Sequence, residues 1–531
     1  MRLLNNSLSA RLLAVRQVIS NKGRKTTGVD GVKLNTPEKK MAAVIWLKQN
    51  NNKNYVAKAL KRVFIPKKQK NQKRQKISLK DLLANTDIPK GWRPLGIPTQ
   101  HDRCLQALHK LSLEPVAETI ADPNSYAYRR YRSVKDAIQQ IFIVLARKSS
   151  AYWILEGDIK GCFDNISHQW TLTNIPLNKH ILKQWLKSGF VYEKHWFKSE
   201  SGTPQGGIIS PVIANMVLDG LEKEIKALKL SKCNFIRYAD DFIVTGANKE
   251  DLENVVKPKI VEFLKERGLT LSEEKTTITN INNGFDFLGS NIRKFKGKLL
   301  IKPAPKSISN LKYKLKTVFR KLQSTSRIEL IETLNPILKG WTNNYDSQVS
   351  KEIFNEIDQY VWIRSVQYMH RRHNRTRFKY FYNRYFTKSN KHKVDVLWAT
   401  KKIEEKKKAP RYVTRKVFRM GEVEIRRHVK VRSSANIFDT TNETYFEKRE
   451  LDKWVRNNKF DIKGKQLRKR QLSKCPQCGH FIYANDAVEI HHKVYKTEGG
   501  SNNLDNLQLL HQNCHKQLHH IRDGTSLVVE A

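Results

Sequence analysis

The sequence has few cysteines, few acidic residues relative to its basic ones, and no long apolar run. Six cysteines among 531 residues are too few for a disulfide framework and favour a reducing compartment. No apolar stretch approaches the ~18 residues that a bilayer-spanning helix needs. The N-terminus also lacks the continuous apolar segment of a secretory signal. These absences predict a protein that is not secreted and not in a membrane, but cytoplasmic (in bacteria) or organellar.

Positive charge is in large excess. Lys and Arg total 100 against 50 Asp and Glu, which gives a formal net charge of +50 and a pI near 10.0. Such a charge repels itself unless a polyanion neutralises it, and release of counterions from a phosphate backbone favours that neutralisation. The composition therefore predicts a nucleic-acid partner and no membrane, and the length predicts several domains.

Two adjacent carboxylates, Asp240 and Asp241, lie between the apolar, β-prone runs 235–238 and 242–244. This pattern predicts a strand, a tight turn and a second strand. Hairpin turns usually contain glycine because they need positive φ, but this turn contains two acids and no glycine. Like charges beside apolar residues repel and lose solvation, so they need a cation. The alternative is a solvent-exposed acidic turn.

A second apolar run, 152–157, ends in the carboxylate of Asp158. Placed beside Asp240 and Asp241, Asp158 would complete a set of three carboxylates from two segments. Hard oxygen ligands of this kind suit Mg²⁺, and two such ions serve polymerases by activating a hydroxyl and neutralising pyrophosphate. The chemistry predicted from these residues is nucleotidyl transfer, catalysed by positioning and charge neutralisation.

These motifs resemble those of a known enzyme class. Tyr238-Ala239-Asp240-Asp241 is similar to the YxDD box of reverse transcriptases, and 158–163 to their first palm motif. The Gly-rich run 201–207 matches a further palm motif, and 269–276 and 285–289 resemble the closing ones. The resemblance covers about residues 60–295 in the right order. It implies a right-hand polymerase with fingers and palm.

The same resemblance implies roles for four nucleotide-binding residues. Arg93, on the second of two fingers strands, would grip the triphosphate with its guanidinium fork. Phe163 would exclude a 2′-hydroxyl, and Gln205 would hydrogen-bond near the nucleotide or template. Lys275 would protonate the departing pyrophosphate. Without the resemblance, Phe163 reads as a core residue and Lys275 as a surface lysine. The basic insertion 67–91 between the strands has no assigned function.

Beyond residue 300 the pattern is helical and basic. Apolar residues recur at helical spacing: Ile308, Leu311, Leu315, Val318, Phe319 and Leu322. The segment 334–345 resembles the thumb-like maturase domain of group II intron proteins, which implies binding of intron RNA. The basic runs 406–408 and 426–432 suggest contacts with DNA phosphates.

The last segment predicts metal sites. Four residues have zinc-ligand spacing: Cys475, Cys478, His511 and Cys514. If 511–520 is helical, 100° per residue places His511 and Cys514 on one edge, with His515 and His519 as i, i+4 neighbours on another. This geometry favours a closed structural zinc site and a separate open site. The alternative is a single zinc finger with surplus histidines.

The order of histidines, glycines and asparagine in this segment is similar to HNH endonucleases of the colicin type. The resemblance implies that His491, His515 and His519 bind the divalent ion of a ββα-metal fold. It makes His492 the general base that activates water, a role that suits neutral imidazole near pH 7. Asn506 would orient that base.

The predicted fold class is α+β multidomain. The expected domains are an N-terminal extension that looks shortened (1–60), fingers and palm (61–300), thumb or maturase domain (301–390), a basic DNA-binding segment (391–470) and an HNH domain (471–531).

The whole pattern is typical of a group II intron-encoded protein that is reverse transcriptase, maturase and HNH endonuclease at once. It implies intron RNA, target DNA and deoxynucleoside triphosphates as partners. The implied cofactors are two Mg²⁺, a structural Zn²⁺ and a divalent nuclease ion. The alternatives are a reverse transcriptase of another system, such as defence, and a splicing cofactor without polymerase activity. The sequence does not predict the oligomeric state.

Overall fold

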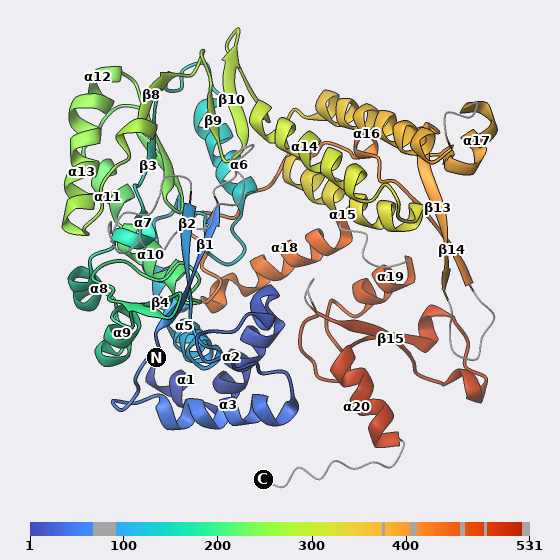
Figure 1. Cartoon of the computed structure of the whole chain (residues 1–531), viewed down its shortest axis with the longest axis horizontal. Helices are drawn as coiled ribbons and strands as arrows, with labels where there is room; N and C mark the ends of the chain where they lie inside the picture. Colours follow the sequence, from blue (N-terminus) through green and yellow to red (C-terminus); the bar gives the residue numbers. More distant parts are fainter. Residues whose placement is uncertain (67–91, 374–377, 404–410, 457–461, 483–485, 523–531) are drawn as a thin grey trace. The chain divides into compact units, whose positions relative to one another are not determined.

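The computed structural model describes residues 1–66, 92–373, 378–403, 411–456, 462–482 and 486–522. The predicted insertion 67–91 and the basic run 406–408 therefore lie outside the described residues. The chain divides into two compact units, Met1–Ser434 and Ala435–Ala531 (Figure 1). Among the described helices, none combines the length and apolar character needed to cross a bilayer.

The N-terminal part of the first unit is helical: α1 (Arg2–Asn6), α2 (Leu8–Ser20), α3 (Pro37–Asn50) and α5 (Gln100–Ile120). Thr99 caps α5, because its hydroxyl accepts a hydrogen bond from the Asp102 N–H at 3.1 Å. Val15, Leu47 and Leu105 are buried in one apolar core that these helices share.

A four-stranded sheet has the order β2-β1-β4-β5, from β1 (Leu60–Pro66), β2 (Trp92–Ile97), β4 (Phe190–Tyr192) and β5 (His195–Phe197). The two strands predicted within 61–98 are confirmed: β1 and β2 pair antiparallel, with Ile65 opposite Arg93. Strand β4 runs parallel to β1.

A second four-stranded sheet has the order β6-β7-β3-β8, from β3 (Trp153–Asp158), β6 (Asn234–Tyr238), β7 (Asp241–Gly246) and β8 (Thr277–Asn280). The predicted strand–turn–strand around Asp240 is confirmed as β6 and β7. Side chains alternate between two cores: Leu155 and Phe242 face one, whereas Ile154 and Ile243 face the other. The sheet is thus buried on both faces.

Helices cover both faces of this sheet (Figure 1). Helix α6 (Val134–Leu145) packs on one face through Ile138 and Ile141. The other core contains residues of α10 (Ser210–Leu218) and α13 (Lys257–Glu266). The remaining short helices here are α7 (Cys162–Asn165), α8 (His168–Asn174), α9 (Lys179–Leu186), α11 (Leu221–Ala227) and α12 (Lys249–Asp251).

Gly157 brings β7 close to β3. A Cβ at this position would lie 2.2 Å from the Phe242 ring. Only a glycine at position 157, directly before Asp158, therefore leaves room for the Phe242 ring against β3.

The three-stranded sheet β9 (Phe285–Phe287), β10 (Ser290–Phe295) and β11 (Lys298–Pro303) leads into a helical bundle: α14 (Pro305–Lys321), α15 (Arg327–Tyr345), α16 (Lys351–Arg372) and α17 (Phe378–Tyr385). The predicted apolar stripe is confirmed on α14, where Leu311, Leu315 and Phe319 are buried in the bundle core. A last sheet contains β12 (Phe386–Lys388), β13 (Asp395–Ile403) and β14 (Arg411–Lys416).

The basic run 426–432 is a strap that packs against α6. His428 Nε2 lies 3.0 Å from the buried Asp136 carboxylate, and the Val431 N–H donates to the same oxygen at 2.8 Å. This pairing, with the Ser133 hydroxyl, outweighs burial and lowers the pKa of Asp136.

The second unit contains α18 (Glu443–Arg456), α19 (Ile462–Arg470), β15 (Val488–His492), β16 (Leu507–His511) and α20 (Gln512–Arg522). Strands β15 and β16 form an antiparallel hairpin, and α20 follows it. The helix predicted over 511–520 begins one residue late, because His511 pairs with Val488 as the last residue of β16. Leu509, Leu510 and Ile482 form its core.

Candidate active site and metal centres

The turn between β6 and β7 contains two residues, because Tyr238 pairs with Asp241. Ala239 has φ 59°, in the region that glycine occupies in such turns. A left-handed alanine costs about 1–2 kcal/mol, and strain of this kind clusters at functional sites. In this turn, Asp240 is half-buried and Asp241 is exposed at the end of the hairpin.

Asp158 reaches the same place from β3, where it is paired directly with Asp241. Burial, followed by the charge of Asp158, raises the pKa of Asp240. Although Asp241 reaches solvent, desolvation and the carboxylates of Asp240 and Asp158 together raise its pKa to about 7. The three carboxylates therefore interact strongly, and a cation would relieve their repulsion.

The donor set fits a divalent ion bound by oxygen. Lys275 already supplies one positive charge, because its Nζ lies 2.5 Å from Asp158 Oδ2. Within the described residues, the ligand atoms of only two groups of side chains all lie within 4.8 Å of one another, and those groups contain cysteine and histidine. The three carboxylates are more widely spread.

Magnesium is expected to stabilise the protein more at pH 8 than at pH 6. The pKa of Asp241 is raised from 3.8 to about 7 in the fold. The metal-free fold therefore loses stability as pH rises from about 4 to 7, and this loss is complete above about pH 7, where the folded carboxylate is ionised. Mg²⁺ relieves that cost only once the carboxylate is ionised. Thermal unfolding with and without Mg²⁺ should show a rise in Tm that is a few degrees larger at pH 8, and Asp241→Asn should remove the difference. An equal rise at both pH values in the wild type would contradict this interpretation.

A buried guanidinium lies behind the hairpin. Arg237, which is 0% exposed, makes a 2.5 Å ion pair with Asp219 and donates to Asn215 Oδ1 at 3.3 Å. It also donates to the Ala239 carbonyl at 3.5 Å. Arg237 thus ties the strained turn to α10 and to the residue that follows it.

Replacing Arg237 by alanine should lower the free energy of unfolding by about 3–5 kcal/mol, because Asp219 would stay buried without its partner. Chemical denaturation followed by circular dichroism would measure the loss. Adding Asp219→Asn to Arg237→Ala should recover part of it, since the lone buried charge is then gone. If the double variant is no more stable than the single one, the uncompensated charge is not the cause.

The predicted nucleotide-binding residues lie around the same hairpin. Arg93 is exposed on β2, and its charge acts on the Asp240 carboxylate. Phe163 follows on α7 and is half-buried, and the edge of Tyr128 meets it with ring centroids 6.4 Å apart. Tyr128 is 52% exposed and has φ 57°. This contact between the two rings was not predicted from the sequence.

The Gly-rich loop 202–207 joins these parts. Gln205 Nε2 donates to Asp164 Oδ2 at 3.2 Å, and the Gln205 carbonyl accepts the Gly96 N–H of β2 at 3.1 Å. A Cβ on Gly202, which has φ +84°, would lie 2.5 Å from the Asp164 carbonyl oxygen. The loop therefore connects the β1–β2 sheet to α7.

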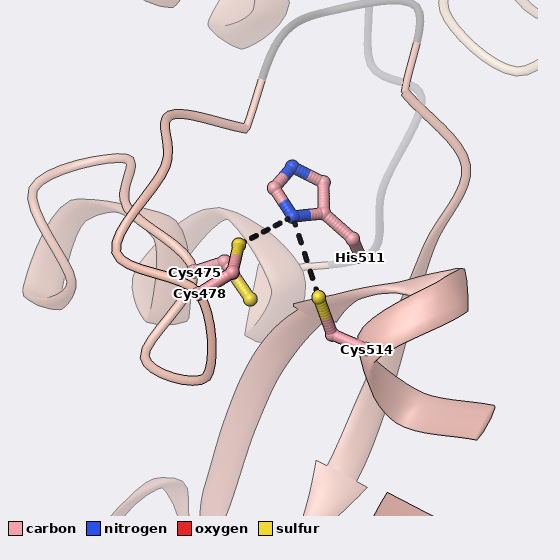
Figure 2. A group of neighbouring side chains, drawn as sticks. All are labelled: Cys475, Cys478, His511 and Cys514. Carbon is pink, nitrogen blue, oxygen red and sulfur yellow. Dashed lines mark hydrogen bonds between the residues drawn. The ribbon is translucent and has the colours of Figure 1, made fainter. Parts of the chain in front are cut away.

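In the second unit, one cysteine–histidine cluster combines Cys475, Cys478, His511 and Cys514 (Figure 2). His511 Nδ1 lies 3.3 Å from Cys478 Sγ and 4.0 Å from Cys514 Sγ. His511 Nε2 lies 3.2 Å from the Phe481 carbonyl, which can only accept, so the proton belongs on Nε2 and Nδ1 is free for a metal. All three cysteines are free thiols.

The thiols of this cluster do not share one protonation state. Burial opposes ionisation of Cys475, but hydrogen bonds from the main chain of His511 and Cys478 outweigh it and lower its pKa to about 7. Burial, followed by the neighbouring cysteines, raises the pKa of Cys514 to about 12. Three sulfurs and one imidazole nitrogen fit a tetrahedral zinc ion, which would ionise every thiol.

A separate histidine cluster combines His491 of β15 with His515 and His519 of α20. The Nε2 atoms of His515 and His519 are 3.3 Å apart. Burial and the two neighbouring imidazoles lower the pKa of His491, which favours the neutral form that binds metals. Glu489 Oε2 lies 2.7 Å from His515 Nδ1 and so directs the Nε2 of this histidine into the cluster.

His492 points away from that cluster toward the loop 499–506. Its Nε2 lies 2.9 Å from Asn502 Oδ1. The Asn506 side chain instead bonds the main chain: its Oδ1 accepts the Val494 N–H at 2.8 Å, and its Nδ2 donates to the Ser501 carbonyl at 2.8 Å. Asn506 therefore fixes the loop, whereas the side chain that contacts the predicted base is Asn502.

Comparison with known families covers most of the chain. Residues 65–292 match the profile described as reverse transcriptase (RNA-dependent DNA polymerase), and 308–386 match the group II intron, maturase-specific domain. Residues 1–47 match the N-terminal domain of reverse transcriptase, and 475–520 match the HNH endonuclease. The matched parts are thus those of a reverse transcriptase, a group II intron maturase and an HNH endonuclease. The reverse transcriptase match implies a polymerase-type α/β fold, and both enzyme domains imply use of divalent metal ions.

Curated relatives agree with this assignment. The group II intron-encoded protein LtrA of Lactococcus lactis subsp. cremoris is 29% identical over 53% of this chain and 54% of its own length. Protein YkfC of Escherichia coli is 26% identical over 52% of this chain and 78% of its own length. The chain thus spans about half the length of LtrA. A solved telomerase from Candida albicans aligns with a TM-score of only 0.35 at 15% identity, over 60% of this chain and 61% of that one, and is too distant to add to the argument.

Proposed function

We propose that the chain is a group II intron-encoded protein, which copies its intron RNA into DNA, assists the splicing of that RNA, and nicks a DNA target to provide the primer. The observation that carries the proposal is the register of β3 and β7, which places Asp158 beside the strained turn of Asp240 and Asp241. Nucleic acid is the partner favoured by the net charge of +50.

In this proposal the sheet β6-β7-β3-β8 is the polymerase palm, and Asp158, Asp240 and Asp241 hold two Mg²⁺ ions. Those ions would supply charge neutralisation and activate the primer hydroxyl. The protein contributes position: Arg237 holds the turn from behind, and Gly157 lets β7 approach β3.

The β1–β2 sheet is then the fingers. Arg93 binds the triphosphate of the incoming deoxynucleotide through its guanidinium. Phe163 restricts the space around the sugar, and Gln205, held by Asp164, contacts the nucleotide or template. Lys275 hydrogen-bonds Asp158 and would donate a proton to the departing pyrophosphate.

The bundle α14–α17 is the thumb, or maturase domain, and binds the intron RNA. Its family match supports this role, and α14 carries several lysines in addition to its buried apolar stripe. The basic segment 391–470 is proposed to contact target DNA. Within that segment, the strap at 426–432 uses His428 to pack on α6.

The second unit would cleave the opposite DNA strand. His491, His515 and His519 hold the divalent ion, which would polarise the scissile phosphate. His492 accepts a proton from water, and Asn502, 2.9 Å away, orients its imidazole. The cluster of Cys475, Cys478, His511 and Cys514 holds a structural Zn²⁺ that keeps β15 and α20 in place.

The proposed function is tested by two measurements on the full-length protein. Primer extension on an RNA template should yield DNA, and sequencing of RNA that co-purifies with the protein should return a group II intron. Extension with some other associated RNA would favour a reverse transcriptase of another system. An intron without extension would favour a splicing cofactor.

Replacing His492 by alanine should lower DNA nicking by about 10²–10⁴-fold, the usual contribution of a general base, and leave primer extension unchanged. A supercoiled plasmid bearing the intron insertion site and a labelled primer would report the two activities. The matched control is His480→Ala, because His480 is exposed and lies in neither metal cluster. Nicking at the wild-type rate by His492→Ala would remove this residue from the mechanism.

A further inference from the structure

A cavity of about 380 Å³ lies away from the carboxylates, in the first unit. It is lined by helix α6, strand β11, the segment 347–351, and two residues at the start of the strap region, Ile425 and Arg427. Helix α6 belongs to the reverse transcriptase match, and 347–351 belongs to the maturase match. The cavity therefore lies where these two parts of the chain meet.

The floor of the cavity is apolar. Ile138, Leu299 and Ile301 are at most 8% exposed, and Phe142 and Ile425 are half-buried beside them. A surface of this kind with one aromatic ring suits the face of a nucleobase. Its volume lies in the range of small-ligand pockets.

Amide groups add hydrogen-bonding capacity to this floor. Gln348, which is 6% exposed, donates through Nε2 to Ser290 Oγ at 2.8 Å. Its Oε1 is buried and, among the described residues, has no hydrogen-bond partner. An exocyclic amino group of a base would supply the missing donor, and Gln139 lines the same cavity. Adenine, cytosine and guanine have such a group, whereas uracil does not. Of these three, only adenine has no carbonyl oxygen, which the apolar floor would leave without a donor.

The lining also carries positive charge. Lys135, Lys351 and Arg427 line the cavity, and one carboxylate, Asp346, lies 2.5 Å from Lys135. The Arg427 guanidinium is exposed and lies 4.5 Å from the centroid of the Phe142 ring. Cations beside an apolar floor match a base that is still attached to its phosphates.

We propose that this cavity binds a single unpaired adenosine of a structured RNA. The base packs on Phe142 and Ile301, its amino group meets Gln348, and its flanking phosphates meet Arg427 and Lys351. The inference deepens the proposed function and rests on it, since that function supplies the RNA. It adds a subsite that reads one extruded base where the reverse transcriptase and maturase segments join.

The test uses the full-length protein and fluorescein-labelled RNA hairpins with the same stem and one unpaired adenosine, one unpaired uridine, or none. Fluorescence anisotropy should show about tenfold tighter binding of the adenosine hairpin than of the fully paired one, with uridine weaker than adenosine. AMP at the same concentration as the hairpin should not displace it, because AMP lacks the second flanking phosphate and the stem. Equal binding of all three hairpins, or displacement by AMP at matching concentrations, would overturn the proposal.

Two variants, each with a matched control, test whether the adenosine preference arises in this cavity. Gln139→Trp fills the cavity and should bring the adenosine preference to within about twofold, whereas Ile143→Trp, on an exposed position of the same helix, should retain it. Arg427→Gln should weaken binding and lower the salt slope by about one, and its neighbour Arg426→Gln should do neither. If the adenosine preference survives both Gln139→Trp and Arg427→Gln, this cavity does not bind the adenosine.

Primer extension on an unstructured RNA template distinguishes failure of the adenosine subsite from failure of the proposed polymerase function. Gln139→Trp should extend as the wild type does. If the wild type extends but shows no adenosine preference, only the subsite fails. If the wild type does not extend, the proposed polymerase function fails.

Discussion

Asp240→Asn is expected to lower RNA-directed DNA synthesis at least about 10³-fold, the scale of losing a group that stabilises transition-state charge. The substitution keeps the size of the side chain and removes one of three interacting carboxylates at the β6–β7 turn. The loss should appear in kcat more than in the KM for deoxynucleotide, because Arg93 is untouched. Single-turnover primer extension on an RNA template measures both.

The fold of this variant should be unharmed. Removing a like charge beside Asp241 lowers repulsion, so the Tm in the absence of Mg²⁺ should stay constant or rise. Glu250→Gln is the matched control, since it removes one negative charge from an exposed position on α12. An Asp240→Asn protein that keeps more than about a tenth of wild-type kcat would show that these carboxylates do not carry the chemistry.

The local parts of this site could be predicted from the sequence, because each depends on neighbours along the chain. The apolar runs flanking Asp240 and preceding Asp158 predict strands, and all three runs are strands. The strand order β6-β7-β3-β8 depends on which segments pair, and the sequence does not encode that pairing locally. The sequence predicted Asp158 beside Asp240 and Asp241, but the pairing of Asp158 with Asp241 across β3 and β7 came only from the structure.

Residues that position other side chains were not predicted, because their partners or their burial cannot be read from the sequence around them. Glu489 lies two positions before His491 on β15, so both share one face of the strand. That spacing could have indicated Glu489, but its partner His515 lies on another element. Asn502 lies on a loop and has no periodic signal at all. Arg237 reads as one more basic residue until its burial is known.

In the HNH-type segment, the predicted side chains come together although the local geometry differs from the prediction. The sequence predicted His511 and Cys514 on one helical edge, whereas His511 ends β16 and Cys514 lies in the first turn of α20. The change from strand to helix still brings His511 Nδ1 within 4.0 Å of Cys514 Sγ. Spacing alone predicted which four side chains would cluster, because a metal site constrains the distances between ligands more than their secondary structure.

Cys475→Ser is expected to remove zinc from the second unit, unfold it and abolish DNA nicking. Structural zinc contributes about 10–16 kcal/mol of apparent folding free energy in small metal-dependent modules. Cys475 is buried, and its main chain bonds Gly479 at 2.8 Å and His480 at 2.9 Å, so the thiol is fixed at the centre of the knuckle. Metal analysis should show zinc falling from about one to near zero per chain, and limited proteolysis should cut within 435–531.

Primer extension should survive this substitution, because the first unit has cores of its own. Cys233→Ser is the matched control: this cysteine lies in the first unit, outside both metal clusters, and should retain zinc and both activities. His519→Ala completes the design, because it removes a ligand from the histidine cluster alone and should abolish nicking while zinc stays bound. If Cys475→Ser keeps its zinc, or if His519→Ala loses it, the two clusters do not have the separate structural and catalytic roles proposed for them.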